Sequence, residues 1–344
     1  MNSKATLMEQ PKQPPSCRLN SLTHRWFAMG TVWELAIYAD RPDSYLQTAA
    51  DEAQREVERL ESRLSFYLPQ SELCDLNKRA YWEEVIVDPP FFEFLRRAKA
   101  LSLETGGAFD PTIAPLMRCW GFVGGSGAMP KVREIEAARY VVGMSHVLLN
   151  DSSSSVRYDR EGVTLEFGAI GKGYAVENVV EILKDYEIVS ALIHGGTSTI
   201  YGLGAPPEQE AWQIAIQRPN GTAGESLTTI SLRDSALSVS APHGKFFEAE
   251  GKRYSHVLDP RSGFPVQSAL LAAVVTENPT DSDALSTALL TLGAEGIPLI
   301  RSLRPNSRLL LAVQEEGSQL QLLDSLSDGS ESGMSMPNLS QIPE

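Results

Sequence analysis

The stretch from residue 226 to residue 257 reads SLTTISLRDSALSVSAPHGKFFEAEGKRYSHV. It consists of short runs of strand-like composition, which are separated by Asp, by Pro-His-Gly and by Glu-Gly. Such residues favour tight turns, and short connections of this kind join antiparallel strands. The pattern predicts an antiparallel meander, and hence an α+β fold with a mixed, largely antiparallel sheet and packed helices rather than a doubly wound Rossmann sheet.

The periodicity of the preceding sequence agrees with this mixture of strands and helices. Apolar residues recur at every second position in segments 31–39 and 211–217, which predicts two half-buried strands. Segment 44–64 has the helical spacing instead, and a second helix is expected from Phe91 to about Leu103. The apolar positions of the first helix are Leu46, Ala49, Ala50, Ala53, Val57, Leu60 and Leu64.

The composition is that of a folded protein, with 42% hydrophobic and 22% charged residues in a chain of 344. The formal net charge is −14 and no cluster of Lys and Arg is present, which argues against a nucleic-acid partner. An anionic ligand must therefore be bound locally, by a metal ion or by a single lysine. The three cysteines lie far apart without CxxC spacing, so neither a disulfide framework nor a zinc site is expected.

Both ends of the chain have the composition of tails. Residues 1–24 are polar and interrupted by Pro, while residues 316–344 are rich in Ser and acidic residues, so we expect disordered segments there and one folded domain over residues 25–315. The first 24 residues lack the apolar run of a signal peptide, and no transmembrane segment is expected. The sequence as written therefore predicts a cytoplasmic protein. Export or membrane anchoring is the alternative if the true N-terminus lies upstream.

The segment TLEFGAIGKGYAVENVVEIL, residues 164–183, predicts a short strand that ends near Phe167 and a helix that follows it. Three glycines fall at the turn between them. Backbone amides there can approach an anion, the helix N-terminus adds partial positive charge, and Lys172 can reach a phosphate oxygen. The turn matches neither the P-loop nor GxGxxG, so a simple tight connection is the alternative.

Asp283 and Thr287 lie four residues apart in the apolar helical segment PTDSDALSTALLTLG, and so on one face of the helix. A carboxylate and a hydroxyl are oxygen ligands of the kind that Mg²⁺ takes, completed by water, phosphate or a carbonyl oxygen. Alternatively, Asp281 or Asp283 caps the helix and Thr287 is packed.

Three further segments carry candidate residues. His256 lies in RYSHVLDPRSGFPV, at the end of a predicted strand beside a Pro-bounded turn, where a histidine serves either as a general base or as a hydrogen-bonded structural residue. In ETGGAFDPT, Phe109 and Asp110 follow a predicted helix end, and they either pack there or form a wall and a carboxylate for a ligand. Tyr67 in SFYLPQSEL either packs in a loop or faces a planar cofactor.

Taken in this order, the motifs resemble the FAD:protein FMN transferases of the ApbE family, from about Phe27 to Leu292. Five separated blocks carry the resemblance: FAMGT at 27–31, SFYLPQSEL at 65–73, TGGAFDPTIAPL at 105–116, GAIGKGYAVE at 168–177, and HVLDPRSGFPV together with DALSTALLTLG. The resemblance implies Mg²⁺-dependent transfer of the FMN half of FAD to a Ser or Thr hydroxyl of another protein, with release of AMP. The implied partners are FAD and a flavin-accepting protein with an exposed Ser or Thr.

The resemblance also implies roles for individual residues. The backbone carbonyl of Ala169, the carboxylate of Asp283 and the hydroxyl of Thr287 would hold Mg²⁺, and His256 would be the catalytic base. The residues expected to line the FAD site are Met29, Tyr67, Ala108, Phe109, Asp110, Glu166, Lys172 and Val257.

The chain departs from the family pattern on the side where the acceptor is expected. Thr197 stands where the family usually has Asp after the paired glycines, and Ala241 and His243 interrupt its usual Ser-Gly-x-Tyr. Glu166 also replaces the more usual Asp. Two alternatives to protein flavinylation therefore remain open: an FAD pyrophosphatase that gives FMN and AMP, and a non-catalytic flavin-binding protein.

Overall fold

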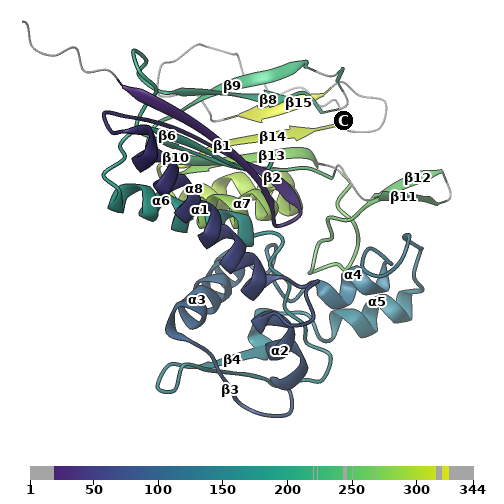
Figure 1. Cartoon of the computed structure of the whole chain (residues 1–344). Coiled ribbons are helices and arrows are strands. Elements are labelled where there is room, and N and C mark those ends of the chain that lie inside the picture. The colour runs from purple at the N-terminus through teal and green to yellow at the C-terminus, as the bar shows by residue number, and fades with distance from the viewer. Residues whose placement is uncertain are drawn as a thin grey trace, which may run out of the picture.

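A large sheet covered by helices on one face forms the centre of the molecule (Figure 1). The computed structural model describes residues 19–219, 221–222, 224–242, 246–249, 251–267, 269–314 and 320–324. Within them an eight-stranded sheet has the order β1-β2-β6-β7-β10-β13-β14-β15, and each neighbouring pair is antiparallel. The predicted α+β class with a largely antiparallel sheet is confirmed.

The strands of this sheet are β1 (Asn20–Ala28), β2 (Thr31–Ala39), β6 (Ala191–Gly195), β7 (Thr199–Leu203), β10 (Ser235–Ser240), β13 (Ala269–Thr276), β14 (Arg308–Val313) and β15 (Gln321–Asp324). Smaller sheets pair β8 (Trp212–Gln217) with β9 (Ser226–Leu232), β11 (Phe246–Ala249) with β12 (Lys252–Ser255), and β3 (Val85–Ile86) and β4 (Val147–Asn150) with β5 (Ser155–Tyr158).

The helices that cover the inner face of the sheet are α1 (Asp43–Leu64), α6 (Gly171–Asp185) and α7 (Pro279–Leu292). The remaining helices are α2 (Glu72–Arg79), α3 (Pro89–Glu104), α4 (Ala114–Cys119), α5 (Val132–Arg139) and α8 (Gly296–Leu303), with short 3-10 turns at Met144–His146 and Gly293–Glu295. The seven apolar positions predicted for the first helix are the buried residues of α1. Burial of this stripe against the sheet explains why the sequence periodicity located the helix.

The strands predicted from 226 to 257 form, but the predicted single meander is wrong. β9 pairs with β8, β10 pairs with β7 and β13, and β11 pairs with β12, so the run is divided among three sheets. The turn chemistry correctly located the chain reversals. It does not specify which strands pair, because pairing depends on the apolar faces that each strand must bury.

Two predicted boundaries are also wrong. β1 begins at Asn20, inside the expected N-terminal tail, and pairs with β2 along its whole length. β15 lies inside the expected C-terminal tail and pairs with β14. Both are edge strands of the sheet, where one side is open to solvent and a polar composition is tolerated. The rest of the predicted tails, residues 1–18 and 325–344, lies outside the described residues.

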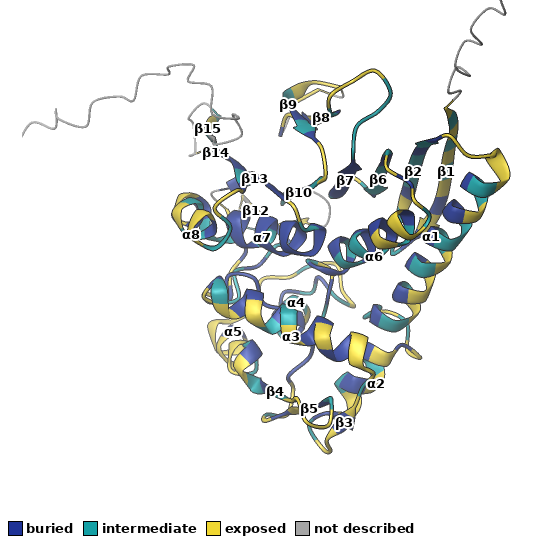
Figure 2. Ribbon diagram, turned by 90° about the vertical axis from the view of Figure 1, so that its left-hand side faces the viewer, coloured by how far each residue is buried: buried dark blue, intermediate teal, exposed yellow. Residues whose placement is uncertain are grey.

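One apolar helical stretch, Pro279–Leu303, is long and apolar enough to cross a membrane by length and composition. It is not one straight helix, since the turn at Gly293–Glu295 separates α7 from α8. Most residues of α7 are buried against β10, β13 and α6 (Figure 2). Its position is that of a core helix.

Candidate functional site

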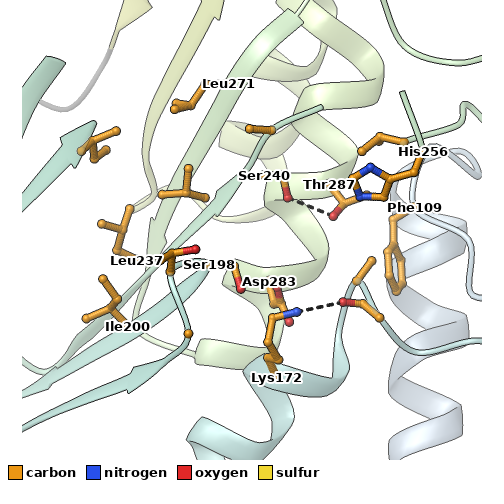
Figure 3. A pocket seen from close by; sticks show the side chains of 18 of the residues that line it. Phe109, Lys172, Ser198, Ile200, Leu237, Ser240, His256, Leu271, Asp283 and Thr287 are labelled. Atoms are coloured by element: carbon orange, nitrogen blue, oxygen red, sulfur yellow. Dashed lines mark hydrogen bonds between the residues drawn. The ribbon is translucent and has the colours of Figure 1, made fainter. Parts of the chain in front are cut away.

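A cavity of about 1110 Å³ lies between the N-terminus of α6, one face of α7, the turn that contains Phe109 and the segment that follows β12 (Figure 3). It extends beside β6, β7, β8 and β10. The predicted site residues that line it are Tyr67, Ala108, Phe109, Asp110, Glu166, Ala169, Lys172, His256, Val257, Asp283 and Thr287. Segments far apart in the sequence therefore meet at one place.

Met29 is the exception among the predicted site residues. It occupies the turn between β1 and β2 with a φ of +50°, and its side chain is partly buried against the main core. It is not among the residues that line the cavity. The block FAMGT locates the turn, but a turn residue in the left-handed region can direct its side chain either way, which the sequence does not specify.

The glycine-rich turn before α6 brings backbone groups to the cavity. No strand precedes it, contrary to the prediction. Leu165 is held by the side chain of Asn77, which bonds both its N–H and its carbonyl, and the N–H of Glu166 donates to Pro111 O at 2.7 Å. Lys172 lies in the first turn of α6 and donates from Nζ to Gly168 O at 3.2 Å. An anion at this helix end would meet the lysine and the partial positive charge of the helix together.

Asp283 is a buried carboxylate, with 4% of its surface exposed. Its Oδ2 accepts from the backbone N–H of Gly173 at 2.9 Å, and its Oδ1 accepts from Thr199 Oγ1 at 3.3 Å. Burial raises the pKa of this carboxyl above its ordinary value, although Lys172 and these two hydrogen bonds act in the opposite direction. Within the described residues no Lys, Arg or His side chain forms an ion pair with Asp283.

Thr287 lies one helical turn beyond Asp283 on the same face of α7. Its Oγ1 is 3.1 Å from Ser240 Oγ on β10, which is also 2.8 Å from Ser286 Oγ. The alternative in which an Asp caps this helix is wrong, because Asn278 is the N-cap and its side chain accepts from the N–H of Asp281. Asp283 and Thr287 are thus available to a ligand in the cavity.

The donor set beside α7 fits a hard cation that is completed by ligand oxygens. It consists of one carboxylate and one hydroxyl, with the carbonyl of Ala169 on the neighbouring turn, and all of these are oxygen donors. The described residues contain no group of three His, Cys, Asp or Glu side chains that could hold a metal by themselves. A buried carboxylate without an ion pair is costly even near the charge of Lys172, and a bound cation would offset that cost.

His256 follows β12 directly and lines the same cavity as Thr287 and Phe109 (Figure 3). The segment after it is fixed by backbone bonds, from Val266 N to Val257 O at 2.9 Å and through the bridge between Leu258 and Pro265. The predicted strand thus ends one residue before His256. The backbone at His256 is therefore held at the cavity wall by the turn that follows.

Asp110 lines the cavity, but both oxygens of its carboxylate already accept hydrogen bonds from other residues of the protein. Oδ1 accepts from both the N–H and the hydroxyl of Thr112, and Oδ2 accepts from Ser102 Oγ and from Met144 N. Two oxygens offer about four acceptor positions. In this arrangement Asp110 orders the turn that presents Phe109, and its expected contact with a ligand hydroxyl or amine stays a prediction.

Tyr67 and Glu166 both line the cavity. The Tyr67 side chain is 63% exposed, so one face of its ring is available to a planar group. Glu166 Oε1 accepts from Gly168 N at 2.7 Å. Burial raises the pKa of the Glu166 carboxyl, against the opposing effects of this bond and of Lys172.

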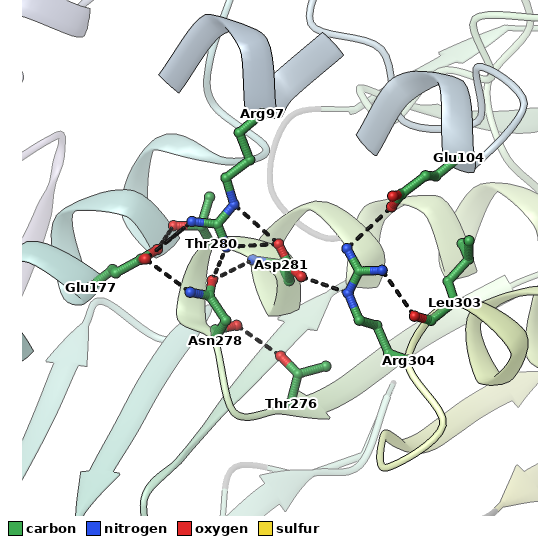
Figure 4. Close-up of polar contacts among 9 residues, drawn as sticks. All are labelled: Arg97, Glu104, Glu177, Thr276, Asn278, Thr280, Asp281, Leu303 and Arg304. Atoms are coloured by element: carbon green, nitrogen blue, oxygen red, sulfur yellow. Dashed lines mark hydrogen bonds and ion pairs between the residues drawn. The ribbon is translucent and has the colours of Figure 1, made fainter. Parts of the chain in front are cut away.

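An ion-pair network clamps the start of α7 to α3 and α6 (Figure 4). Arg97 of α3 donates from Nη1 to Glu177 of α6 at 2.8 Å and from Nη2 to Asp281 of α7 at 2.7 Å. Asp281 also accepts from Arg304 Nε at 2.6 Å. The network fixes the helix that bears Asp283 against the helix that bears Lys172.

We expect Arg97→Met to lower the free energy of unfolding by about 2 kcal/mol, because it leaves partly buried carboxylates with fewer partners. Urea denaturation followed by circular dichroism measures this. Arg96→Met is the matched control, since Arg96 lies on the same helix and pairs with the exposed Glu93, so its loss should cost less than about 0.5 kcal/mol. Equal effects of the two changes would contradict the clamping role.

The departures from the family pattern are partly visible. Thr197 and Ala241 line the cavity. His243 lies outside the described residues. Sequence reasoning did not identify Thr199, Ser238 and Ser240, which connect β7 and β10 to the two ligand candidates of α7. The alternation of Ser with apolar residues in SALSVS was the available signal, because small hydroxyl residues on one strand face are unusual in a core.

Comparison with known proteins agrees with this geometry. The model of the ApbE family matches residues 29–311. The FAD:protein FMN transferase of Treponema pallidum (strain Nichols) is 28% identical over 81% of this chain and 80% of that protein, and one from Klebsiella pneumoniae (strain 342) is 31% identical over 70% and 74%. The crystal structure of the ApbE protein from Thermotoga maritima gives a TM-score of 0.79 at 27% identity and covers 88% of this chain and 96% of that chain. Since the family match spans most of the folded domain and includes every segment that forms the cavity, the chain belongs to the ApbE family.

Proposed function

We propose that this chain transfers the FMN half of FAD to a Ser or Thr hydroxyl of a target protein and releases AMP. The curated relatives bear the name of this activity. The observation that carries the proposal is the meeting of Asp283, Thr287, Lys172 and His256 at one cavity. A buried carboxylate without an ion-pair partner, a lysine at a helix N-terminus and a histidine suit phosphoryl transfer.

The proposal includes Mg²⁺ as cofactor, held by the Asp283 carboxylate, the Thr287 hydroxyl and the Ala169 carbonyl. When bound, Mg²⁺ would neutralise the charge that develops on the phosphate oxygens and on the departing AMP. The chain's own contribution is to hold these three oxygens together. Gly173 and Thr199 orient the Asp283 carboxylate, and Ser240 orients the Thr287 hydroxyl.

The remaining cavity residues would bind and orient FAD. Lys172 and the N-terminus of α6 line the same cavity as Asp283 and Thr287, so a pyrophosphate bound there would meet the lysine and the positive end of the helix. Tyr67 offers an exposed aromatic face for a planar ring. Phe109, at 1% exposure, is a rigid wall rather than a mobile contact. Fixing the phosphorus in line with the incoming hydroxyl would supply part of the acceleration.

The transfer step is a substitution at the phosphorus on the FMN side of the pyrophosphate. The acceptor oxygen forms a bond to that phosphorus. The bond between the phosphorus and the bridging oxygen breaks, so that AMP leaves with the bridging oxygen. His256 takes the proton of the acceptor hydroxyl. Lys172 stabilises negative charge on the oxygens of the phosphate.

Product analysis tests the proposal. The protein is incubated with FAD, MgCl₂ and a pool of short peptides that each contain one Thr in otherwise random sequence. Peptide that stays fluorescent after denaturing electrophoresis is the expected result. Free FMN with AMP and no labelled peptide would mean an FAD pyrophosphatase, and intact FAD would mean a non-catalytic flavin-binding protein, so either outcome would overturn the proposal.

We expect His256→Gln to slow the transfer by about a thousandfold, because the acceptor hydroxyl loses its base. The affinity for FAD should change by less than about threefold, since the phosphate and ring contacts remain. Initial rates and a fluorescence titration with FAD measure the two quantities. His146→Gln is the control, because His146 pairs with Asp159 away from the cavity and should leave both unchanged. A His256→Gln enzyme with the wild-type rate would exclude the proposed base.

A further inference from the structure

Among the residues that the structure describes, other elements cover only part of the outer face of the large sheet. The hairpin of β8 and β9 packs over β7, β10, β13 and β14, with Trp212, Ile214 and Ile216 pointing down onto Ile200 and Leu237. Figure 2 shows the hairpin above β7 and β10, while β6, β2 and β1 extend beyond it. The hairpin still contacts these strands at two places, through Trp212 against Tyr38 of β2 and through its apolar cluster against Leu192 of β6, but the rest of their outer face extends beyond it.

This uncovered face has apolar residues. On β1 and β2, Phe27 and Val32 stand directly opposite each other and are 69% and 58% exposed. They alternate with the buried Trp26 and Trp33, which face the helices, so they lie on the outer side. On β6, Leu192 is partly exposed and alternates with the buried Ile193 in the same way.

The edge of β8 borders this face and is open. Within the described residues β8 pairs with β9 alone, so one row of its N–H and C=O groups has no strand partner. On β9, by contrast, the carbonyl of Ser231 accepts from Arg308 Nη2 on β14 at 2.7 Å. An unpaired edge next to an apolar surface is a template for one more strand.

The space beside β8 is continuous with the catalytic cavity. All residues from Gln213 to Pro219 line this space. Because residues from both faces of β8 are among them, we infer that β8 presents its edge to the cavity. Leu192 and His194 form the floor. We call this part of the cavity, bounded by β8 and β6, the β8 groove. Thr197, Ala241 and His256 line the same cavity.

We propose that the acceptor polypeptide binds in the β8 groove as an extended strand, paired with the edge of β8 and lying over β6, so that its hydroxyl residue reaches His256. This inference rests on the proposed function. It specifies the acceptor's chemistry: a segment that can be extended, with apolar side chains at alternate positions facing Leu192 and no Pro where an N–H must pair with β8.

The spacing of the elements supports this occupant over a helix or a compact loop. A strand added to β8 lies ~4.8 Å from it, over the next strand of the sheet below, which is β6. Its alternate side chains would then cover Leu192 and extend the apolar layer of the hairpin. The main-chain bonds would fix its register along β8, and register determines which residue arrives at the phosphorus.

Two substitutions test the proposal. Leu192→Glu places a charge on the floor of the β8 groove. Thr229→Glu places the same charge on the exposed side of β9, at a residue that does not line the cavity, and is the matched control. Both proteins are incubated with FAD, MgCl₂ and peptides in which one Thr is flanked on each side by about six random residues, the length of an ordinary strand. The labelled peptides are sequenced by mass spectrometry.

We expect peptides labelled by the unaltered protein to have apolar or β-branched residues at alternate positions on one side of the Thr, with Pro depleted there. Leu192→Glu should lower the yield by about tenfold and Thr229→Glu by less than about twofold, with FAD affinity unchanged in both. Absence of the sequence pattern, equal yields from the two variants, or a loss of FAD affinity equal to the loss of yield would each overturn the proposal.

The pattern in the unaltered protein decides the question even if Leu192→Glu fails to fold. If the proposed function is wrong, no peptide is labelled at all, and the proposal for the β8 groove is then overturned as well. If peptides are labelled without the alternating pattern, only the proposal that the acceptor binds in the β8 groove is overturned.

Discussion

Asp283→Asn is expected to lower the rate of Mg²⁺-dependent FMN transfer by at least about a thousandfold, because the amide has the shape of the carboxylate but lacks its charge. The amide oxygen can still accept from Gly173 N, so the local fold should persist. Transfer rates at several MgCl₂ concentrations measure the effect. Activity equal to that of the unaltered protein would exclude Asp283 as a metal ligand.

Although Asp283→Asn should lower the rate of transfer, it should raise the stability of the metal-free protein. Burial raises the pKa of the Asp283 carboxyl above its unfolded value. The folded state therefore binds this proton more tightly than the unfolded state, and the charged carboxylate destabilises the fold at pH values above the raised pKa. Asp283→Asn removes that charge, so the metal-free variant should melt at a higher temperature at neutral pH. The advantage should shrink as the pH falls towards the ordinary pKa of Asp.

Asp281→Asn distinguishes this effect from a general effect of removing a carboxylate. Asp281 lies two residues away on the same helix but accepts from Arg97 and Arg304. Its neutralisation should lower the melting temperature and leave the Mg²⁺ dependence of transfer intact. Thermal unfolding followed by circular dichroism, with and without MgCl₂, compares the two variants. A rise in melting temperature for both would contradict the assignment.

Gly173→Ala is the substitution with the largest expected effect on stability. A Cβ on Gly173 would lie 2.4 Å from Pro279 O, 2.7 Å from Asp283 Cβ and 2.9 Å from Thr280 Cα. Two of these atoms are backbone, so α6 and α7 must separate to admit it. We expect a loss of about 3 kcal/mol in the free energy of unfolding, together with a loss of transfer activity, because the separation also breaks the bond from Gly173 N to Asp283.

Gly171→Ala is the matched control in the same helical turn. Its Cβ would meet only Phe167 Cβ, at an ordinary contact distance of 3.8 Å. Because Ala also has the higher helix propensity, the change should be neutral or stabilising by up to about 1 kcal/mol. Chemical denaturation of the two variants measures both. If Gly173→Ala were as stable as Gly171→Ala, the close contact between α6 and α7 would not exist in solution.

The sequence predicted those parts of the fold in which one local pattern determines one element. The apolar stripe of α1 and the alternation in β2 and β8 are examples, since each element buries a single face. The strand expected up to Phe167 failed for the opposite reason. Its backbone groups bond to the side chain of Asn77 and to Pro111, which are remote in sequence, and no local pattern reports such partners.

The candidate site divides in a similar way. Helical spacing placed Asp283 and Thr287 on one face and the glycine-rich turn indicated Lys172, while the roles of these residues were expected from the resemblance to the family. Thr199, Ser240 and the network around Arg97 were not predicted, since they reach the site from other strands and helices. The β8 groove depends on which strands pair, so it becomes visible only when the sheet order is known.

The ratio of AMP released to flavin attached to peptide tests the central claim most directly. Both products are measured over time in one reaction that contains the protein, FAD, MgCl₂ and the Thr-containing peptides. A transferase releases one AMP for each FMN that it attaches, so the two amounts should rise together and in equal measure. AMP that accumulates with free FMN while no flavin is attached to peptide would contradict the account.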